Sequence, residues 1–352
     1  MAFTTMNNFN YFAKIVVTSV RFAATATQQS SYSPLFSFYH KDLKIVQIDQ
    51  SQMKPKPTSW DNLKFGLYSD HMMEVDWHMH NGWAPPLISP LHNFNLHPGA
   101  KVFHYAIELF EGIKAYRGVD NKIRMFRPDK NMERMRKTAI RASLPDFDGD
   151  ELMKIISNMI ILDNEWVPYS NASSLYIRPT LIGTDPTLGI DFSQQAKLFV
   201  LTGPVGNHYL GFRPIALLAD PGFVRAFPGG VGGYKMGSNY APTIMVGKLA
   251  KDMSCQQALW LYDSDEKITE AGTMNIFVYW INEQGEEEFV TPPLTDGLIL
   301  PGITRDSILE IANEWKKFKV TERYPTMAEI KRSLKEKRVD RHLFRRVPTP
   351  ND

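Results

Sequence analysis

The sequence predicts a mixed α+β protein built as two domains. Strand-like and helix-like segments follow one another without the regular strand–helix–strand alternation of a doubly wound parallel sheet. The length of 352 residues is sufficient for two domains with separate cores. Residues 203–213 are rich in Gly, Pro, Asn and His, show no periodicity, and form the expected interdomain linker. We therefore expect a smaller α/β domain over 57–202 and a larger domain over 214–339.

The smaller domain is expected to begin its regular structure near Trp60. Alternating apolar and polar residues indicate strands, and apolar residues that recur with a helical period indicate amphipathic helices. Met132, Met135 and Ala139, for example, line one side of a helix. In chain order, the sequence predicts strands over 65–74 and 122–126, helices over 131–142 and 150–166, and strands over 174–182 and 197–202.

The larger domain repeats this mixture of elements. In chain order, the sequence predicts a strand over 214–219, a helix over 242–253, strands over 258–262 and 275–282, and a helix over 306–318. No internal repeat connects the two halves.

The bulk composition excludes several functional classes. A formal net charge of +2 gives no reason to expect a nucleic-acid partner. The single cysteine, Cys255, excludes an intrachain disulfide framework and a cysteine-built zinc site. His78 and His80 have a spacing that can chelate zinc, but no third ligand is suitably spaced, so no metal site is expected. No apolar run is long enough to span a bilayer, so no membrane association is expected.

The amino-terminal segment, residues 1–41, contains no Asp or Glu. Lys14, Thr18 and Arg21 share one face of a helix by their spacing, and apolar residues cover much of the rest. An amphipathic, basic, acid-free segment is typical of a mitochondrial transit peptide, which predicts a location in the mitochondrial matrix. The alternative is a disordered terminus on a cytoplasmic protein.

Lys235 is the strongest candidate for covalent chemistry. It lies in the glycine-rich turn 232–240. Glycines that flank a lone lysine let the backbone approach a bulky ligand closely. A lysine amine in such a site can form a Schiff base with a carbonyl compound. Taken alone, the segment is more typical of a solvated lysine on a flexible loop.

Three further segments carry candidate groups. Thr304 is placed to cap a helix after Pro301–Gly302, and free N–H groups at a helix start bind phosphate. Glu270 lies between two apolar strands, where a carboxylate can keep a pyridine nitrogen protonated. Arg134 and Arg225 carry guanidinium groups that suit phosphate oxygens. The plain alternatives are a strand–turn–helix junction, a solvated turn carboxylate and hydrated arginines.

Taken together, residues 60–326 closely resemble the branched-chain amino acid aminotransferases, which are fold-type IV pyridoxal-phosphate enzymes. The resemblance implies the two-domain architecture of that fold, with the cofactor bound by the larger domain, and the leader favours the mitochondrial animal type. The stretches that carry it are Leu96–Gly99, His104–Gly112, Ser174–Thr180, Tyr234–Gly237, Ile268–Asn275 and Leu300–Arg305.

The resemblance implies pyridoxal 5'-phosphate as the cofactor and gives residues roles toward it. Lys235 matches the catalytic lysine that holds the cofactor and moves a proton at the substrate's α-carbon. Glu270 matches the partner of the pyridine nitrogen, and Tyr240 matches the phenol that hydrogen-bonds the ring hydroxyl. The remaining cofactor-side matches are Arg134, Arg225, and the backbone at Ile303 and Thr304.

The resemblance also implies the reaction, in which leucine, isoleucine or valine gives its amino group to 2-oxoglutarate and a branched-chain 2-oxo acid and glutamate result. Arg178 matches the group linked with the side-chain carboxylate of glutamate, and Leu188 matches a residue lent by the partner subunit of a homodimer. Aromatic walls with a single polar group suit a pocket for aliphatic and acidic side chains. The other pocket matches are Phe65, Tyr105, Phe110, Tyr176 and Thr273. A D-amino-acid substrate on the same fold is a weaker alternative.

Beyond about Val339 the resemblance stops. The family continues through a loop of small residues and then the strands and helices that complete the large domain, whereas this chain has a short basic tail, residues 340–352. We therefore expect an incomplete large domain. The alternative function is an inactive isoform that at most pairs with a full-length subunit.

Overall fold

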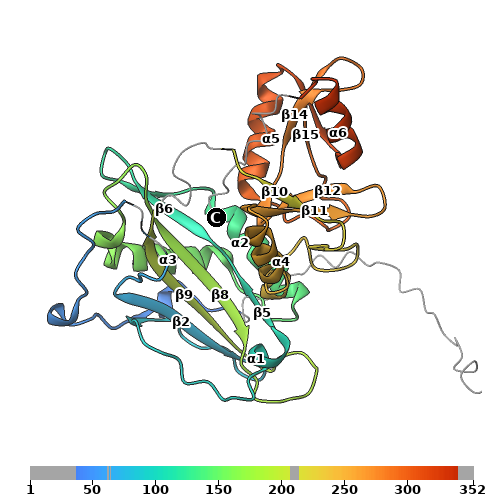
Figure 1. Cartoon of the computed structure of the whole chain (residues 1–352). Coiled ribbons are helices and arrows are strands. Elements are labelled where there is room, and N and C mark those ends of the chain that lie inside the picture. Colours follow the sequence, from blue (N-terminus) through green and yellow to red (C-terminus); the bar gives the residue numbers. More distant parts are fainter. Residues whose placement is uncertain (1–36, 62, 64, 207–213, 340–352) are drawn as a thin grey trace, which may run out of the picture. The chain divides into compact units, whose positions relative to one another are not determined.

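The computed structural model describes residues 37–61, 63, 65–206 and 214–339. The strands in these ranges form three sheets, one before residue 206 and two after residue 214 (Figure 1). The expected transit peptide up to residue 36, most of the expected linker and the tail 340–352 lie outside the described residues. The division into two domains therefore stays a prediction, whereas the mixed α+β class is confirmed.

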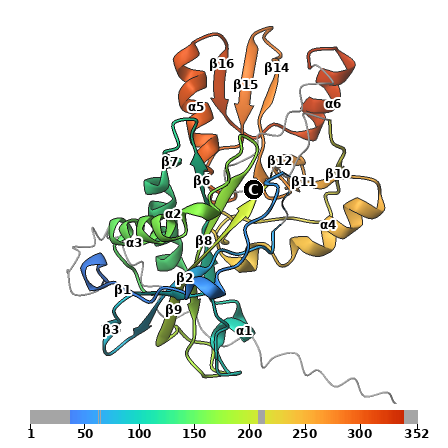
Figure 2. The same cartoon turned by 90° about the vertical axis from the view of Figure 1, so that its left-hand side faces the viewer.

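The first sheet has the strand order β1-β4-β2-β9-β8-β6-β7, with β3 paired to β2 and β5 paired to β8. Its long central pair, β8 (Ser174–Gly183) and β9 (Gln195–Val205), is antiparallel over the whole length of β8 (Figure 2). The other strands are β1 (Lys44–Ile45), β2 (His71–His78), β3 (Gly82–Trp83), β4 (Leu87–Pro90), β5 (Glu108–Phe110), β6 (Ile113–Arg117) and β7 (Ile123–Met125).

Two helices share a hydrophobic core with this sheet, α2 (Pro128–Arg141) and α3 (Gly149–Leu162). Proline at the first position suits the start of α2 because its missing N–H needs no partner there. The side chain of Asp148 caps α3 by accepting from the N–H groups of its first turn. The smaller helices of this half are η2 (His40–Asp42), η3 (Gln50–Gln52), α1 (Lys101–Tyr105) and η4 (Asn164–Trp166).

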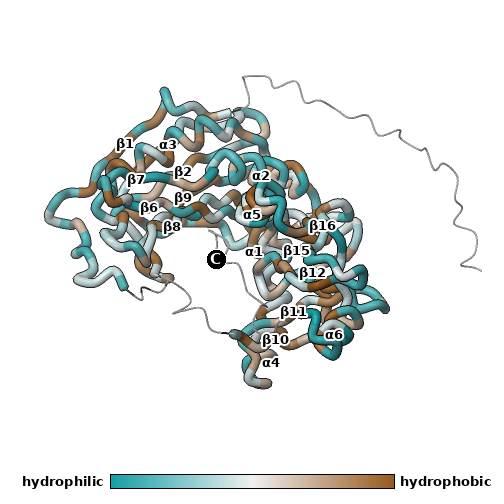
Figure 3. The backbone as a smooth tube through the Cα atoms, turned by 90° about the horizontal axis from the view of Figure 1, so that it is seen from above, coloured by the Kyte–Doolittle hydropathy of each residue, from teal (hydrophilic) through white to brown (hydrophobic). Residues whose placement is uncertain are grey.

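The second half carries two sheets, β10-β11-β12-β13 and β14-β15-β16. Ile268, Val278 and Ile330 belong to one core cluster, to which both sheets and helix α6 contribute. Figure 3 shows hydrophobic stretches within the strands of the protein. The elements are β10 (Leu217–Ala219), η5 (Gly237–Asn239), α4 (Thr243–Asp252), β11 (Gln257–Tyr262), β12 (Lys267–Ala271), β13 (Met274–Asn275), β14 (Val278–Ile281), β15 (Glu287–Thr291), α5 (Ile303–Trp315), β16 (Lys319–Glu322) and α6 (Met327–Lys335).

Several predicted elements have different limits in the structure. The strand expected over 65–74 begins only at His71, because the chain turns at Gly66, whose φ is +119°. The helix expected over 150–166 ends at Leu162. The side chain of the next residue, Asp163, accepts a hydrogen bond from the backbone N–H of His71. Strand β9 continues through Val205 into the expected linker. The strand expected over 275–282 is divided, because the chain passes from one sheet to the next between β13 and β14.

None of the helices in the described ranges has the length and apolar character that crossing a membrane requires. The same ranges contain no cluster of three or more His, Cys, Asp or Glu side chains arranged to hold a metal ion.

Candidate active site

One cavity of about 220 Å³ gathers most of the site residues that the sequence predicts. Its walls come from both halves of the sequence, which places Arg178 of β8 and Lys235 in the same cavity. The predicted residues that line it are Phe65, Phe110, Arg134, Tyr176, Arg178, Lys235, Tyr240, Glu270 and Thr273. The sequence reasoning missed the other three lining residues, Asn275, Leu300 and Gly302.

Lys235 is held in the cavity wall by its backbone. Its N–H donates to Oγ1 of Thr138 in α2 over 3.2 Å, and its C=O accepts from the N–H of Phe110 in β5 over 3.1 Å. The next residue, Met236, forms a β-bridge with Leu109. The side chain is buried, so Lys235 is not the solvated loop lysine that the sequence left open.

The Lys235 amine faces two aromatic side chains. Its Nζ lies 3.3 Å from the hydroxyl oxygen of Tyr240 and donates a hydrogen bond to it. It also lies 5.0 Å from the ring centre of Phe110, which packs against the ring of Tyr240. An amine in this position can reach a ligand in the cavity, and the phenol of Tyr240 orients the amine.

The glycines around Lys235 lie close to other parts of the protein. A methyl group added at Gly232 would overlap the backbone carbonyl of Leu298, and one added at Gly237 would overlap the carboxylate of Glu108. These glycines therefore allow the turn to pack closely against other parts of the protein.

Glu270 and Arg225 form a buried ion pair at one side of the cavity. Oε2 of Glu270 lies 2.7 Å from Nε of Arg225. The other carboxylate oxygen accepts from the N–H of Leu300 and from Nδ2 of Asn275, each over 3.0 Å. These contacts fix the carboxylate in position beside the cavity. Arg225 itself does not line the cavity and reaches it through Glu270.

Arg134 is tied to a carboxylate that the sequence reasoning did not single out. Its Nε and Nη2 donate to the two carboxylate oxygens of Glu111 over 2.7 and 2.9 Å, and its Nη1 donates to the C=O of Pro301. Burial alone would raise the pKa of Glu111, but the adjacent Arg134 outweighs burial and holds the pKa below its ordinary value. The pair fixes the guanidinium at the cavity edge.

Replacing Glu111 with glutamine should lower the free energy of unfolding at pH 7 by about 3–5 kcal/mol, because a buried arginine loses its counter-charge. The pKa of Glu111 is lower in the folded than in the unfolded state, so its contribution is complete above the ordinary value of 4.5 and is lost as the pH falls through the folded-state pKa. Urea unfolding of wild type and Glu111→Gln should therefore differ most near neutral pH and converge in acid.

The matched control is Glu133→Gln, on the same helix as Arg134, where an exposed carboxylate pairs with Lys137. That change should cost less than about 1 kcal/mol at any pH. A Glu111→Gln protein as stable as wild type at pH 7, or a difference that does not depend on pH, would contradict the role given to this pair.

The start of helix α5 lies beside Arg134 at the cavity. Gly302 is the N-cap of this helix and lines the cavity, and the N–H groups of Ile303 and Thr304 follow in its first turn. Backbone N–H groups at this position have no partner within the helix. Oγ1 of Thr304 is also buried and finds no hydrogen-bond partner among the described residues. Unused donors next to a fixed arginine fit a phosphate group.

Part of the cavity lining is aromatic. The rings of Phe65 and Tyr176 meet edge to face with centres 5.2 Å apart. Arg178 donates from Nη2 to the hydroxyl of Tyr176 over 2.7 Å, and its guanidinium lies 4.6 Å from the ring centre of Phe110. Nε of Arg178 is buried without a hydrogen-bond partner in the described part of the chain. This wall combines apolar surface with one cationic group.

Two predicted pocket residues lie outside the cavity lining, Tyr105 and Leu188. They contact each other, because the hydroxyl of Tyr105 donates to the backbone C=O of Leu188. The side chain of Leu188 is 67% exposed and belongs to a loop in which Ile190 and Phe192 are exposed as well. Within the described chain these two residues therefore form no part of the cavity.

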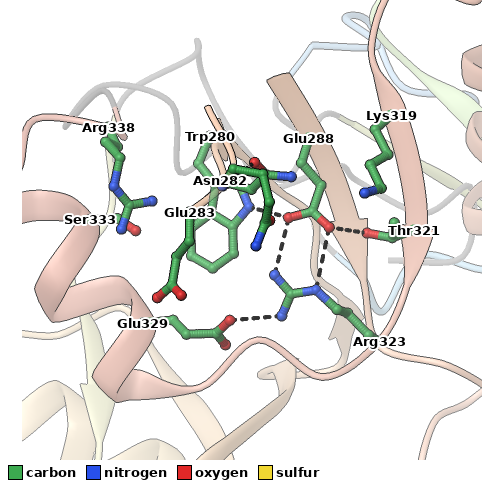
Figure 4. A pocket seen from close by; sticks show the side chains of 11 residues that line it. Trp280, Asn282, Glu283, Glu288, Lys319, Thr321, Arg323, Glu329, Ser333 and Arg338 are labelled. Atoms are coloured by element: carbon green, nitrogen blue, oxygen red, sulfur yellow. Dashed lines mark hydrogen bonds and ion pairs between the residues drawn. The ribbon is translucent and has the colours of Figure 1, made fainter. Parts of the chain in front are cut away.

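A second cavity, of about 340 Å³, lies in the sheet β14-β15-β16 and contains none of the predicted site residues. Figure 4 shows the carboxylate of Glu288 bonded to Thr321 and Arg323, and Arg323 bonded in turn to Glu329. The charged side chains that line this cavity all have ion-pair partners, either in the lining or next to it, which favours a structural role.

Comparisons with known proteins agree with this geometry. The family model described as amino-transferase class IV matches residues 108–334. The cytosolic branched-chain-amino-acid aminotransferase of Caenorhabditis elegans is 59% identical over 305 residues, which is 86% of this chain and 74% of that protein. The mitochondrial enzyme of Rattus norvegicus is 50% identical over 311 residues, covering 88% and 78%.

Solved structures share the fold. The branched-chain aminotransferase of Thermoproteus uzoniensis, solved with norvaline, aligns with a TM-score of 0.58 at 23% identity, covering 73% of this chain and 80% of that one. The PLP form of the Thermobaculum terrenum enzyme aligns with a TM-score of 0.57 at 20% identity, covering 72% and 78%. With a family match over more than half of its length and such close relatives, this chain belongs to the class IV aminotransferases and, within them, to the branched-chain-amino-acid aminotransferase family.

Proposed function

We infer that this protein is an enzyme that transfers the amino group of leucine, isoleucine or valine to 2-oxoglutarate. The observation that carries the inference is a buried lysine whose amine shares one cavity with a fixed carboxylate, an arginine at a helix start and an aromatic wall. Family membership supports the same reaction. A D-amino-acid substrate or an inactive isoform has no specific observation in its favour.

The cavity has the groups that pyridoxal 5'-phosphate requires. Arg134 and the first N–H groups of α5, with Oγ1 of Thr304, would hold the phosphate. Glu270 would accept from the ring nitrogen, and Tyr240 would hydrogen-bond the ring hydroxyl. Bound pyridoxal phosphate supplies a carbonyl carbon that an amine can attack and a ring that withdraws electrons.

Lys235 is the catalytic residue in this proposal. Its Nζ removes the proton from the α-carbon of the substrate and returns it on the cofactor side, as a general base and then a general acid. The hydrogen bond to the Tyr240 hydroxyl orients the amine, and the buried position keeps water away from it. Glu270, held ionised by Arg225, keeps the electron-withdrawing ring in its protonated form.

The aromatic wall binds the substrate side chain. Phe65, Phe110 and Tyr176, with Thr273, surround an aliphatic group, and Arg178 pairs with the side-chain carboxylate when glutamate or 2-oxoglutarate binds. Because amino donor and acceptor use the same cavity in turn, the kinetics should be ping-pong.

Turnover assays test the proposed reaction. Purified protein supplied with pyridoxal phosphate should form glutamate from leucine and 2-oxoglutarate, and should turn over D-alanine far more slowly. A preference for D-alanine would establish the alternative substrate, and protein that binds the cofactor but turns over neither amino acid would establish the inactive isoform.

We also propose a homodimer. The loop with Leu188, Ile190 and Phe192 exposes apolar side chains, and Leu188 and Tyr105 are the two expected pocket residues that the cavity of one chain does not use. A second copy that covers this loop would bring Leu188 into its partner's pocket. Light scattering of the purified protein should give twice the mass of one chain, and the mass of a single chain would contradict the proposal.

The mitochondrial matrix is the proposed location, on the basis of the basic, acid-free segment 1–41. Relatives of both mitochondrial and cytosolic type support either compartment. A reporter fused behind residues 1–41 should accumulate in mitochondria, and an evenly cytosolic signal would reject the targeting role. A control fusion with Lys14 and Arg21 changed to glutamate should stay in the cytosol.

A further inference from the structure

Glu108 is a charged residue beside the cavity that the proposed mechanism does not use. It begins strand β5, two residues before Phe110, so the two side chains lie on the same face of the strand. In the antiparallel pairing with β8, Glu108 lies opposite Ile182 and Phe110 lies opposite Thr180. Arg178 follows on the same face of β8, because residues two apart along a strand share a face.

The carboxylate of Glu108 also lies against the turn that carries Lys235. Gly237, two residues after the lysine, has no side chain, and a methyl group there would overlap Oε1 of Glu108. The carboxylate is therefore placed between β8 and the lysine turn, at the edge of the cavity and half-buried.

Glu108 and Arg178 influence each other without forming an ion pair. Among the described residues, neither has an oppositely charged partner within 4.0 Å, and Nε of Arg178 is buried without a partner. Burial raises the pKa of Glu108 above its ordinary value, although the positive charge of Arg178 acts to lower it. Arg178 thus keeps Nε available as a donor while a negative charge lies nearby.

We propose that Glu108 is a specificity-determining residue, whose carboxylate offsets the charge of Arg178 and weakens the hold of that arginine on an acidic side chain. This inference rests on the proposed function, in which one pocket takes glutamate and an aliphatic amino acid in turn. An unopposed arginine would favour the dicarboxylate. A nearby carboxylate reduces this bias and leaves the binding of uncharged side chains unaffected.

The test is the variant Glu108→Gln, which keeps the size of the side chain and removes its charge. Calorimetric titration of the holoenzyme with glutarate and with 4-methylpentanoate measures the two kinds of side chain separately. Glutarate should bind roughly three- to tenfold more tightly to the variant, with the affinity for 4-methylpentanoate changed less than about twofold. The KM values for glutamate and leucine should move in the same pattern.

The matched control is Glu314→Gln, which removes an exposed carboxylate of α5 and should leave both affinities unchanged. An unchanged affinity ratio in Glu108→Gln would overturn the inference, and so would an equal loss for both acids, which indicates a structural role. If the wild type bound neither acid, the proposed function itself would fail. If it bound both and the ratio did not respond, only the role of Glu108 would fail.

Discussion

Replacing Lys235 with alanine should lower the turnover of leucine by at least about 10⁴-fold, the upper range for loss of a positioned general acid–base. The amine is the basic group within hydrogen-bond reach of Tyr240 in the cavity, and its backbone is fixed by Thr138 and Phe110. Alanine keeps those backbone bonds, so the fold should survive. Steady-state assays measure the loss of turnover. The visible absorbance of the bound cofactor measures whether it is still linked to the protein.

Lys248→Ala provides the control, because this lysine is exposed on helix α4. It should keep wild-type turnover and absorbance. If Lys235→Ala retained turnover within about tenfold of wild type while Lys248→Ala was normal, the proton transfer would have to be carried by another group. Thermal unfolding of both variants without cofactor separates a chemical defect from a folding defect.

Replacing Glu270 with glutamine should lower turnover by about 10²–10³-fold, the range seen when one fixed electrostatic group is removed from an active site. Glutamine can still accept from the N–H of Leu300, but it no longer carries the charge that favours a protonated ring nitrogen. The covalent link at Lys235 should still form, because the hydrogen bond that Tyr240 accepts from the amine stays in place. Cofactor content and turnover of the variant measure the two properties.

The control for Glu270 is Glu288→Gln. Glu288 is another buried carboxylate paired with an arginine, Arg323, but it lies in the second cavity (Figure 4). Both variants remove a carboxylate that pairs with a buried or half-buried arginine and should lose stability, although Arg323 keeps Glu329 as a second partner. Only Glu270→Gln should lose turnover beyond that shared effect. Turnover of Glu270→Gln within about threefold of Glu288→Gln would contradict the role given to Glu270.

Elements whose residues follow a clear period could be predicted from the sequence. Strands β8 and β9 and helix α2 were expected within a few residues of their observed limits, because alternation and helical spacing are local properties. The start of β2 was misplaced because the chain turns at Gly66, and the end of α3 was misplaced beside a contact that is not local. Asp163, the residue after α3, bonds the backbone and ring of His71, 92 residues away.

The site residues likewise divide into those that the sequence identifies and those whose role depends on contacts in the folded chain. Lys235 and Glu270 were identified through ordered motifs that resemble a known family. Arg134 was singled out on a predicted helix, and the cavity brings these three residues together. Glu111 stood in one of those motifs but had no recognisable role, because its importance depends on Arg134, 23 residues later in the chain. The pairing of Glu270 with Arg225 likewise depends on the folded chain.

The central claim is that the amine of Lys235 forms a covalent bond with the carbonyl carbon of pyridoxal phosphate in this cavity. Borohydride treatment of the cofactor-loaded protein, followed by digestion and mass measurement of the peptides, tests it directly. The account predicts one pyridoxyl-phosphate adduct, on the peptide that contains Lys235. Its absence, or an adduct at another lysine with Lys235 unmodified, would contradict the account.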